Sequence, residues 1–179
     1  MNKSARVIIT FDCNRNCPYC CNNYDSILDQ AMFQNDLNFI RQQNLDEIAI
    51  TGGEPLLYPD YLIDLLNRIR DIDPDITIYL YSALYTDKLM EIIKLIDGLH
   101  FTLHKGTNNK DIKGFLAVQN VARMYKDSNK TFRLFVHREV NKNIVIKPSL
   151  WHRVEVKGWL PEGECPLPED QLIILEEGK

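Results

Sequence analysis

Short apolar runs alternate along this chain with longer segments whose apolar residues recur at helical spacing. The short runs are rich in β-branched residues and end at turn residues, which is typical of strands. The longer segments carry apolar residues three and four positions apart, as Leu62, Leu65, Leu66 and Ile69 do. The pattern predicts strands over Arg6–Phe11, Glu47–Ile50, Ile76–Tyr81, Leu99–Leu103, Phe132–Val140 and Arg153–Val156, and helices over Met32–Gln43, Tyr61–Arg70, Thr86–Ile96 and Asp111–Tyr125. We expect Thr86 to cap its helix.

The alternation of strands and helices predicts an α/β fold with a parallel sheet and right-handed crossovers. A closed (β/α)8 barrel takes about 250 residues, and this chain has 179. We therefore expect a partial (β/α)6 TIM-like barrel: an open, curved sheet with helices on its outer face and an exposed edge. We expect residues 1–145 to form the core and residues 146–179 to add a last strand and a Pro-rich tail to the same domain. Trp151 and Trp159 are expected to cover the open core.

Composition and charge narrow the function classes. The chain is 45% hydrophobic and 26% charged, as ordinary globular proteins are. We expect a cytoplasmic protein without a membrane segment, since there is neither an apolar run of about 20 residues nor a signal-peptide pattern. The net charge of −4 argues against a general nucleic-acid surface.

Cysteine spacing introduces candidate chemistry. Four of the five cysteines lie between Cys13 and Cys21, whereas a disulfide scaffold would spread them along the chain. Cys13, Cys17 and Cys20 form a CxxxCxxC pattern that places three soft ligands on one loop. An iron–sulfur cluster held by three thiolates would keep one iron open to a small molecule. A zinc site with Cys21 as fourth ligand and a chance grouping of thiols are the alternatives.

A glycine-rich turn follows the second predicted strand. Gly52 and Gly53 let the backbone approach a ligand closely, and Pro55 stiffens the turn. Glu54 adds a carboxylate. By itself the string is an ordinary strand-to-helix turn. Since ligands bind at the C-terminal ends of parallel strands, the turn and the cysteine loop are expected at the same edge of the sheet.

Together, the CxxxCxxC loop and the Gly-Gly-Glu-Pro turn resemble the radical S-adenosylmethionine (SAM) superfamily. The resemblance covers about residues 7–140. It implies that Cys13, Cys17 and Cys20 ligate a [4Fe–4S] cluster whose fourth iron binds the methionine moiety of SAM. It also implies that the turn contacts that moiety and that Tyr19 lies near the adenine. These implied SAM-binding residues are Gly52, Gly53, Glu54, Pro55 and Tyr19.

Weaker matches to this superfamily extend the predicted site. Ser82 ends the third strand, and Thr102 and His104 stand where many members contact the ribose. His104 departs from the acid found there and is equally a candidate for contacting substrate or for a half-exposed strand end. His137 and Arg138 end the fifth strand, where they either reach the site or are solvated. We expect Cys21 to be a spare thiol. The lone Cys165 argues against an auxiliary cluster.

The resemblance also implies a reaction. The reduced cluster cleaves SAM to methionine and a 5′-deoxyadenosyl radical, which abstracts hydrogen from a substrate. An open barrel favours a peptide or protein substrate, as in the activating enzymes of glycyl-radical proteins. A small-molecule synthase like the carboxy-deazaguanine synthases is the alternative enzyme, and a non-catalytic zinc-binding regulatory module is the alternative from another class. A reductant protein such as flavodoxin or ferredoxin is the expected partner.

Overall fold

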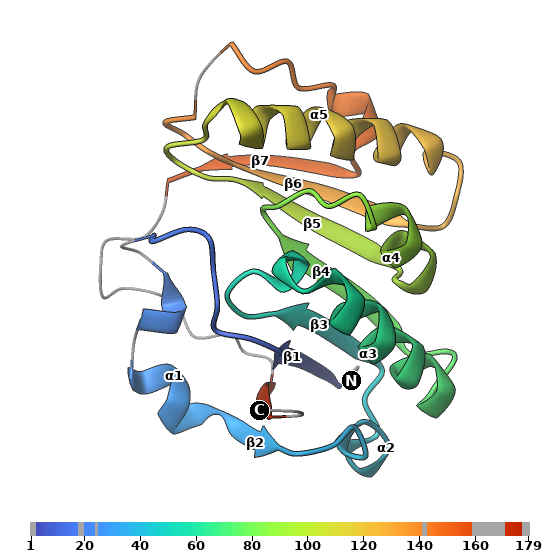
Figure 1. The fold of residues 1–179 in the computed structure, drawn as a ribbon. Helices are drawn as coiled ribbons and strands as arrows, with labels where there is room; N and C mark the ends of the chain where they lie inside the picture. Colours follow the sequence, from blue (N-terminus) through green and yellow to red (C-terminus); the bar gives the residue numbers. More distant parts are fainter. Residues whose placement is uncertain (1–2, 18–19, 24, 141–142, 159–170, 177–179) are drawn as a thin grey trace.

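A single all-parallel sheet organises the computed structural model of the protein (Figure 1). The structure describes residues 3–17, 20–23, 25–140, 143–158 and 171–176. The sheet has eight strands in the order β2-β8-β1-β3-β4-β5-β6-β7. The strands are β1 (Ser4–Ile8), β2 (Met32–Gln34), β3 (Glu47–Thr51), β4 (Thr77–Ser82), β5 (Gly98–Leu103), β6 (Thr131–His137), β7 (Arg153–Lys157) and β8 (Gln171–Leu175).

Helices follow most of the strands. They are α1 (Asp25–Gln30), α2 (Phe39–Gln43), α3 (Pro59–Ile72), α4 (Leu89–Leu95) and α5 (Asn109–Met124), with short 3-10 turns η1 (Cys21–Asn23), η2 (Pro55–Leu57) and η3 (Pro148–Leu150). Figure 1 shows α3, α4 and α5 side by side on one face of the sheet. The fold is therefore the expected α/β, open, partial TIM-like barrel, with β2 and β7 at its two edges.

Two strands exceed the six that chain length suggested. Met32–Gln43 is not one helix as predicted, because Met32, Phe33 and Gln34 form β2 and only Phe39–Gln43 is helical. Strand β8 lies between β1 and β2 and pairs in parallel with both. The local pattern predicted no regular element after Val156. Both misses have one cause, because β2 and β8 are defined by pairing between segments about 140 residues apart, which local periodicity does not report.

The start of the third predicted helix and the C-terminal cover also differ from expectation. Helix α4 begins at Leu89, and no side chain caps it, so Thr86 is not its cap. Trp151 is 7% exposed and stacks on Phe115 of α5 with ring centroids 6.0 Å apart. It therefore packs in the helix-side core, while β7 extends the sheet beyond β6. Trp159 lies outside the described residues.

Strand alternation gives the sheet two different surfaces. Ile48, Ile50, Ile78, Leu80 and Leu99 face the helices and belong to the main hydrophobic core. We call the opposite surface the inner face; it carries the residues that alternate with these, such as Tyr79 and His100. Because all strands are parallel, their C-terminal ends meet at one edge, which is where the two sequence motifs lie.

Candidate functional site

The cysteine loop and the Gly-Gly-Glu-Pro turn are bonded to each other at the C-terminal edge of the sheet. The loop follows β1, and the turn follows the neighbouring strand β3. The backbone N–H of Gly53 donates to the Thr10 carbonyl at 2.7 Å, and that of Glu54 donates to the Asp12 carbonyl at 2.8 Å. The Tyr58 hydroxyl donates to Asp12 Oδ2 at 2.5 Å. These bonds fix the segment that leads into Cys13.

Both glycines of the turn are required by this contact. Gly52 has φ +132°, a conformation that other residues rarely adopt, and a Cβ there would lie 2.2 Å from the Thr10 carbonyl oxygen. A Cβ on Gly53 would lie 2.1 Å from the Asp12 carbonyl oxygen. The glycines therefore let the cysteine loop pack directly on the turn, a role in addition to the ligand contact that the sequence predicted for them.

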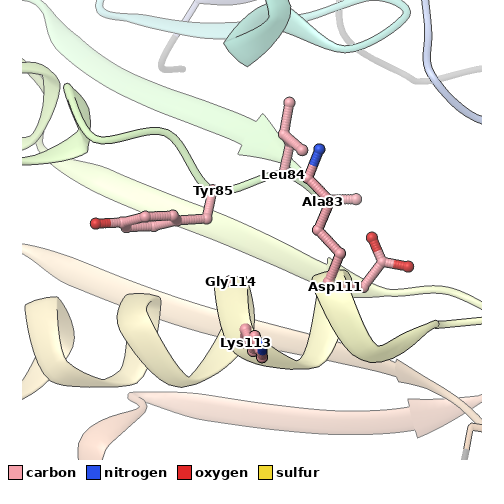
Figure 2. A pocket seen from close by; sticks show the side chains of 7 residues that line it. Ala83, Leu84, Tyr85, Asp111, Lys113 and Gly114 are labelled. Atoms are coloured by element: carbon pink, nitrogen blue, oxygen red, sulfur yellow. The ribbon is translucent and has the colours of Figure 1, made fainter.

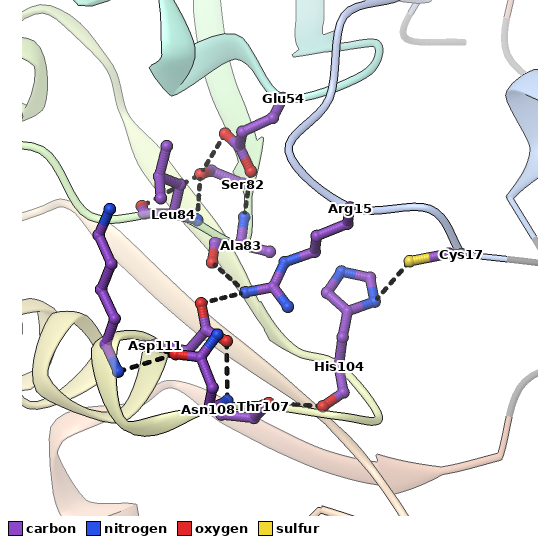
Figure 3. Close-up of polar contacts among 11 residues, drawn as sticks. Arg15, Cys17, Glu54, Ser82, Ala83, Leu84, His104, Thr107, Asn108 and Asp111 are labelled. Carbon is purple, nitrogen blue, oxygen red and sulfur yellow. Dashed lines mark hydrogen bonds and ion pairs between the residues drawn. The ribbon is translucent and has the colours of Figure 1, made fainter.

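Glu54 is buried, and its carboxylate binds groups of the protein itself (Figure 3). Oε1 accepts bonds from the Ser82 hydroxyl at 2.7 Å and the Leu56 N–H at 3.0 Å, and Oε2 accepts from the Ala83 N–H at 2.8 Å. Burial raises the pKa of this carboxyl against the opposing effect of its hydrogen bonds. Pro55 begins the buried η2 turn. The carboxylate thus ties the turn to the end of β4, and any contact of this turn with SAM stays a prediction.

A second connection runs from the cysteine loop to helix α5. Arg15, two residues after Cys13, binds Asp111 Oδ1 through Nη2 at 2.7 Å, and both side chains are nearly buried. The same Nη2 lies 3.4 Å from the Ala83 carbonyl. Asp111 Oδ2 accepts from the Asn108 N–H, while Asn108 Oδ1 caps the first turn of the helix. The carboxylate therefore closes a capping box and anchors the loop at once.

This anchor was absent from the sequence prediction. The signal that could have found it is the Asn108-x-x-Asp111 spacing, which marks a helix start with a carboxylate held near the sheet edge. A groove of about 580 Å³, much of it open to solvent, lies beside the pair and is lined by Ala83, Leu84, Tyr85, Lys110, Asp111, Lys113 and Gly114 (Figure 2). The groove belongs to the junction between α5 and the loop after β4.

The three predicted cluster ligands all lie on the loop that follows β1. Cys13 is exposed, and Cys17 and Cys20 are half-buried. Partial desolvation of the sulfur raises the pKa of the Cys13 thiol, and smaller electrostatic effects of Glu54 and Cys20 act in the same direction. Three soft donors on one loop suit a [4Fe–4S] cluster. In the described part of the chain, no three His, Cys, Asp or Glu side chains converge as the ligands of a single metal ion would.

His104 lies against the cysteine loop. Its Nδ1 is 3.8 Å from the Cys17 sulfur (Figure 3), and its carbonyl accepts a bond from the Thr107 hydroxyl at 2.5 Å. Burial, with the charges of Arg15 and His137, lowers the pKa of His104 to about 4. Thr102 is half-buried on the inner face one step earlier along β5. The structure thus brings His104 to the cysteines, and its contact with ribose stays a prediction.

Other predicted residues fall into two groups. His137 is buried at the end of β6, where its Nδ1 accepts from the Glu139 N–H at 3.1 Å, and Arg138 beside it is exposed. Tyr19, Cys165 and the side chain of Cys21 lie outside what the structure describes. None of the described helices is long and apolar enough to cross a membrane.

Comparison with known proteins agrees with this arrangement. The family model of the radical SAM superfamily matches residues 7–145. A GTP 3′,8-cyclase from Limosilactobacillus fermentum is 35% identical over 76 residues, which are 38% of this chain and 23% of that enzyme. The chain therefore spans less than a quarter of this curated relative. Since the family match covers most of the chain, including the cysteine loop and the glycine turn bonded to it, the chain belongs to the radical SAM superfamily.

Proposed function

We propose that Cys13, Cys17 and Cys20 hold the [4Fe–4S] cluster and that residues 52–55 bind the methionine moiety of SAM. Members of the superfamily use this cluster and SAM as cofactors. The observation that carries the assignment is the backbone bonding between the two motif segments, Gly53 N–H to the Thr10 carbonyl and Glu54 N–H to the Asp12 carbonyl. It supports one continuous site in which cluster and SAM are adjacent.

The bound cluster and SAM supply a 5′-deoxyadenosyl radical when an electron arrives, and the protein's own residues do the positioning. The loop is anchored at its start by the glycine turn and at Arg15 by Asp111. Glu54 holds Ser82 and Ala83 beneath the predicted SAM site. A fixed frame of this kind orients reactants, which is the main contribution that a protein makes to cofactor chemistry.

The proposed reaction is hydrogen abstraction from a small organic molecule on the inner face, followed by oxidoreductase or lyase chemistry. Two observations support this substrate class. The inner face carries polar and aromatic side chains that lead along β5 to His104 and the cysteine loop. The relative described above acts, by its name, on GTP, a small molecule.

A peptide or protein substrate, as for a glycyl-radical activating enzyme, is the second candidate. The open sheet favours it, because β2 and β7 each pair on one side only in the described residues. For either substrate we propose a cytoplasmic enzyme that takes its electron from a protein such as flavodoxin or ferredoxin. This proposal is supported by the need of radical SAM enzymes for a reductant.

Metal and sulfide analysis after anaerobic reconstitution tests the cluster assignment. We expect about four iron and four sulfide per chain, with loss of the cluster's broad visible absorbance in Cys13→Ala, Cys17→Ala and Cys20→Ala. Cys21→Ala and Cys165→Ala are matched controls and should keep it. Zinc without labile sulfide would overturn the proposal in favour of the regulatory-module alternative, and loss in Cys21→Ala would change the ligand set.

A further inference from the structure

The inner face concentrates cations on a chain that is acidic as a whole. Strands β1 and β3 to β7 place six charged residues on this face: Arg6, Glu47, Arg133, Arg153, Glu155 and Lys157. Four of them are cations and two are carboxylates, whereas the whole chain has a net charge of −4. The positive charge is therefore local, and its position on the sheet is what needs explanation.

Aromatic rings lie between these cations at the centre of the sheet. Tyr81 and His100 are register partners, and so are His100 and Arg133. The His100 ring centroid is 4.3 Å from that of Tyr81 and 5.2 Å from that of Tyr79. Arg6 Cζ lies 5.7 Å from the Tyr81 centroid, and Arg133 Cζ lies 5.8 Å from the Tyr79 centroid. The rings hold both guanidinium groups beside His100.

Arg133 is the register partner of His100 on the inner face. It is half-buried, and no carboxylate of the described residues pairs with it. On the neighbouring strand, by contrast, Glu155 pairs with both Arg153 and Lys157. None of the Arg133 nitrogens is both buried and unbonded, so these donors can reach solvent or a bound anion. The cation–π contact of Arg133 with Tyr79 satisfies one side of the guanidinium group and leaves its hydrogen-bond donors without a described acceptor.

His100 is the second unsatisfied group. It is 3% exposed, and neither ring nitrogen has a hydrogen-bond partner in the described part of the chain. Burial, together with the charges of Arg133 and Arg6, lowers the pKa of His100 to about 4. At neutral pH it therefore offers one donor and one acceptor. A buried polar group without a partner marks a place where water or a ligand group belongs.

The groove beside α5 is a weaker site for an anion. Lys110 and Lys113 line it, yet the first N–H groups of α5 are already bonded to Asn108. Asp111 also places a carboxylate in its lining. Arg133 and His100, which have no counter-charge and no hydrogen-bond partner, respectively, among the described residues, both lie on the inner face instead.

We propose that the inner face binds a small organic anion through a carboxylate or phosphate group, with Arg133 as its charge partner and His100 as a neutral hydrogen-bonding neighbour. This inference rests on the proposed function, because it names the substrate class of the same enzyme. His100 and Thr102 project to the same side of β5, and His104, which contacts Cys17, follows the end of the strand; four residues of extended chain place the anion site about 13 Å from the cysteine loop. Recognition at one end would thus leave the other end of the molecule to face the radical.

Three probes with a common ring test the charge requirement on the reconstituted holoprotein: phenyl phosphate, benzoate and the uncharged benzamide. In equilibrium dialysis at low salt, we expect at least one anion to bind more tightly than benzamide, and the tighter anion identifies phosphate or carboxylate as the recognised group. If neither anion binds more tightly than benzamide, the proposal is overturned.

Matched variants locate the site. We expect Arg133→Gln to lower the affinity for the tighter-binding anion by about tenfold or more. Arg6→Gln serves as a second inner-face variant if Arg133→Gln does not fold. Arg123→Gln makes the same change on the exposed side of α5, and Lys113→Gln removes a cation from the groove; neither should alter affinity. Equal affinity in the inner-face variants and Arg123→Gln, or loss only in Lys113→Gln, overturns the proposal.

The test of anion binding can fail independently of the test of the proposed function. Iron and sulfide content and SAM cleavage in the absence of substrate report on the cluster site alone. Cluster assembly with SAM cleavage but no Arg133-dependent anion binding would refute this inference and leave the proposed function intact. Arg133-dependent binding by a protein that assembles no cluster would do the reverse.

Discussion

The two faces of the sheet are built from the same strands and differ in almost every other respect. On the helix side, residues such as Ile48, Ile78 and Leu99 are fully buried in one aliphatic core. On the inner face, their neighbours Tyr79 and His100 carry rings and polar atoms, with arginines over the tyrosines. The difference separates two tasks: the helix side supplies the free energy of folding, and the inner face carries groups that folding alone does not require.

The largest expected effect comes from making the same substitution on both faces. Phe101 of β5 faces the helices and is 2% exposed, whereas Phe135 of β6 is half-buried on the inner face. We expect Phe101→Ala to lower the free energy of unfolding by about 3–5 kcal/mol. Phe135→Ala should lower it by roughly 1–2 kcal/mol, because less of its ring area is buried.

Denaturant titration of the two variants measures this difference. The slope of the free energy against denaturant should be unchanged, which shows that both variants unfold from a native-like state. Losses of equal size would mean that the inner face contributes to the core as much as the helix side does, and the division of tasks would fail.

The next largest effect is expected at Gly53, in the glycine turn at the C-terminal edge of the sheet. A methyl group on Gly53 collides with the Asp12 carbonyl, so Gly53→Ala should cost roughly 1–3 kcal/mol as overpacking does. Because Asp12 precedes Cys13, we expect iron content and SAM affinity to fall together. Gly106→Asn is the control: Gly106 has φ +78°, which asparagine tolerates, and no atom lies near its Cβ position. Normal iron content in Gly53→Ala would contradict the packing role.

A smaller effect is expected at the second anchor of the loop. Asp111→Asn keeps an oxygen to accept from the Asn108 N–H but removes the charge that holds Arg15. We expect a stability loss of about 1–2 kcal/mol and faster loss of the cluster in air. Asp64→Asn is the matched control, because Asp64 pairs with Arg68 on the exposed side of α3. Indistinguishable cluster lifetimes in the two variants would show that the Arg15–Asp111 pair does not position the loop.

The smallest effect at neutral pH is expected for His100→Phe, because the imidazole is neutral there and makes no hydrogen bond with a described residue. In acid, the free energies of unfolding of the wild type and of His100→Phe should diverge. Folding lowers the pKa of His100 from 6.5 to about 4, so protonation favours the unfolded chain. The contribution of the neutral His100 imidazole to the free energy of unfolding is therefore complete above pH 6.5 and is lost as the pH falls toward 4. Unfolding curves across this range should show a steeper acid loss for the wild type, and parallel curves would contradict the burial of a neutral imidazole.

Local patterns predicted the elements whose formation depends on local sequence. The stripe of Leu62, Leu65, Leu66 and Ile69 placed α3, and the alternation of strands and helices placed both motifs at one edge. Strand β8 was not predicted, because a buried apolar run in a Pro-rich tail becomes a strand only through pairing with β1 and β2. The inner-face site was not predicted for a related reason: His100 and Arg133 are 33 positions apart and belong to neither motif, and only strand register brings them together.

The formation of 5′-deoxyadenosine from SAM tests the central claim most directly. The reconstituted protein is incubated without oxygen with SAM and a chemical reductant, and the nucleoside is measured by chromatography. We predict 5′-deoxyadenosine from the wild type and from Cys165→Ala, and only background levels from Cys13→Ala, Cys17→Ala and Cys20→Ala. A wild-type protein that holds iron and sulfide yet forms no 5′-deoxyadenosine would contradict the account, as would undiminished product from Cys17→Ala.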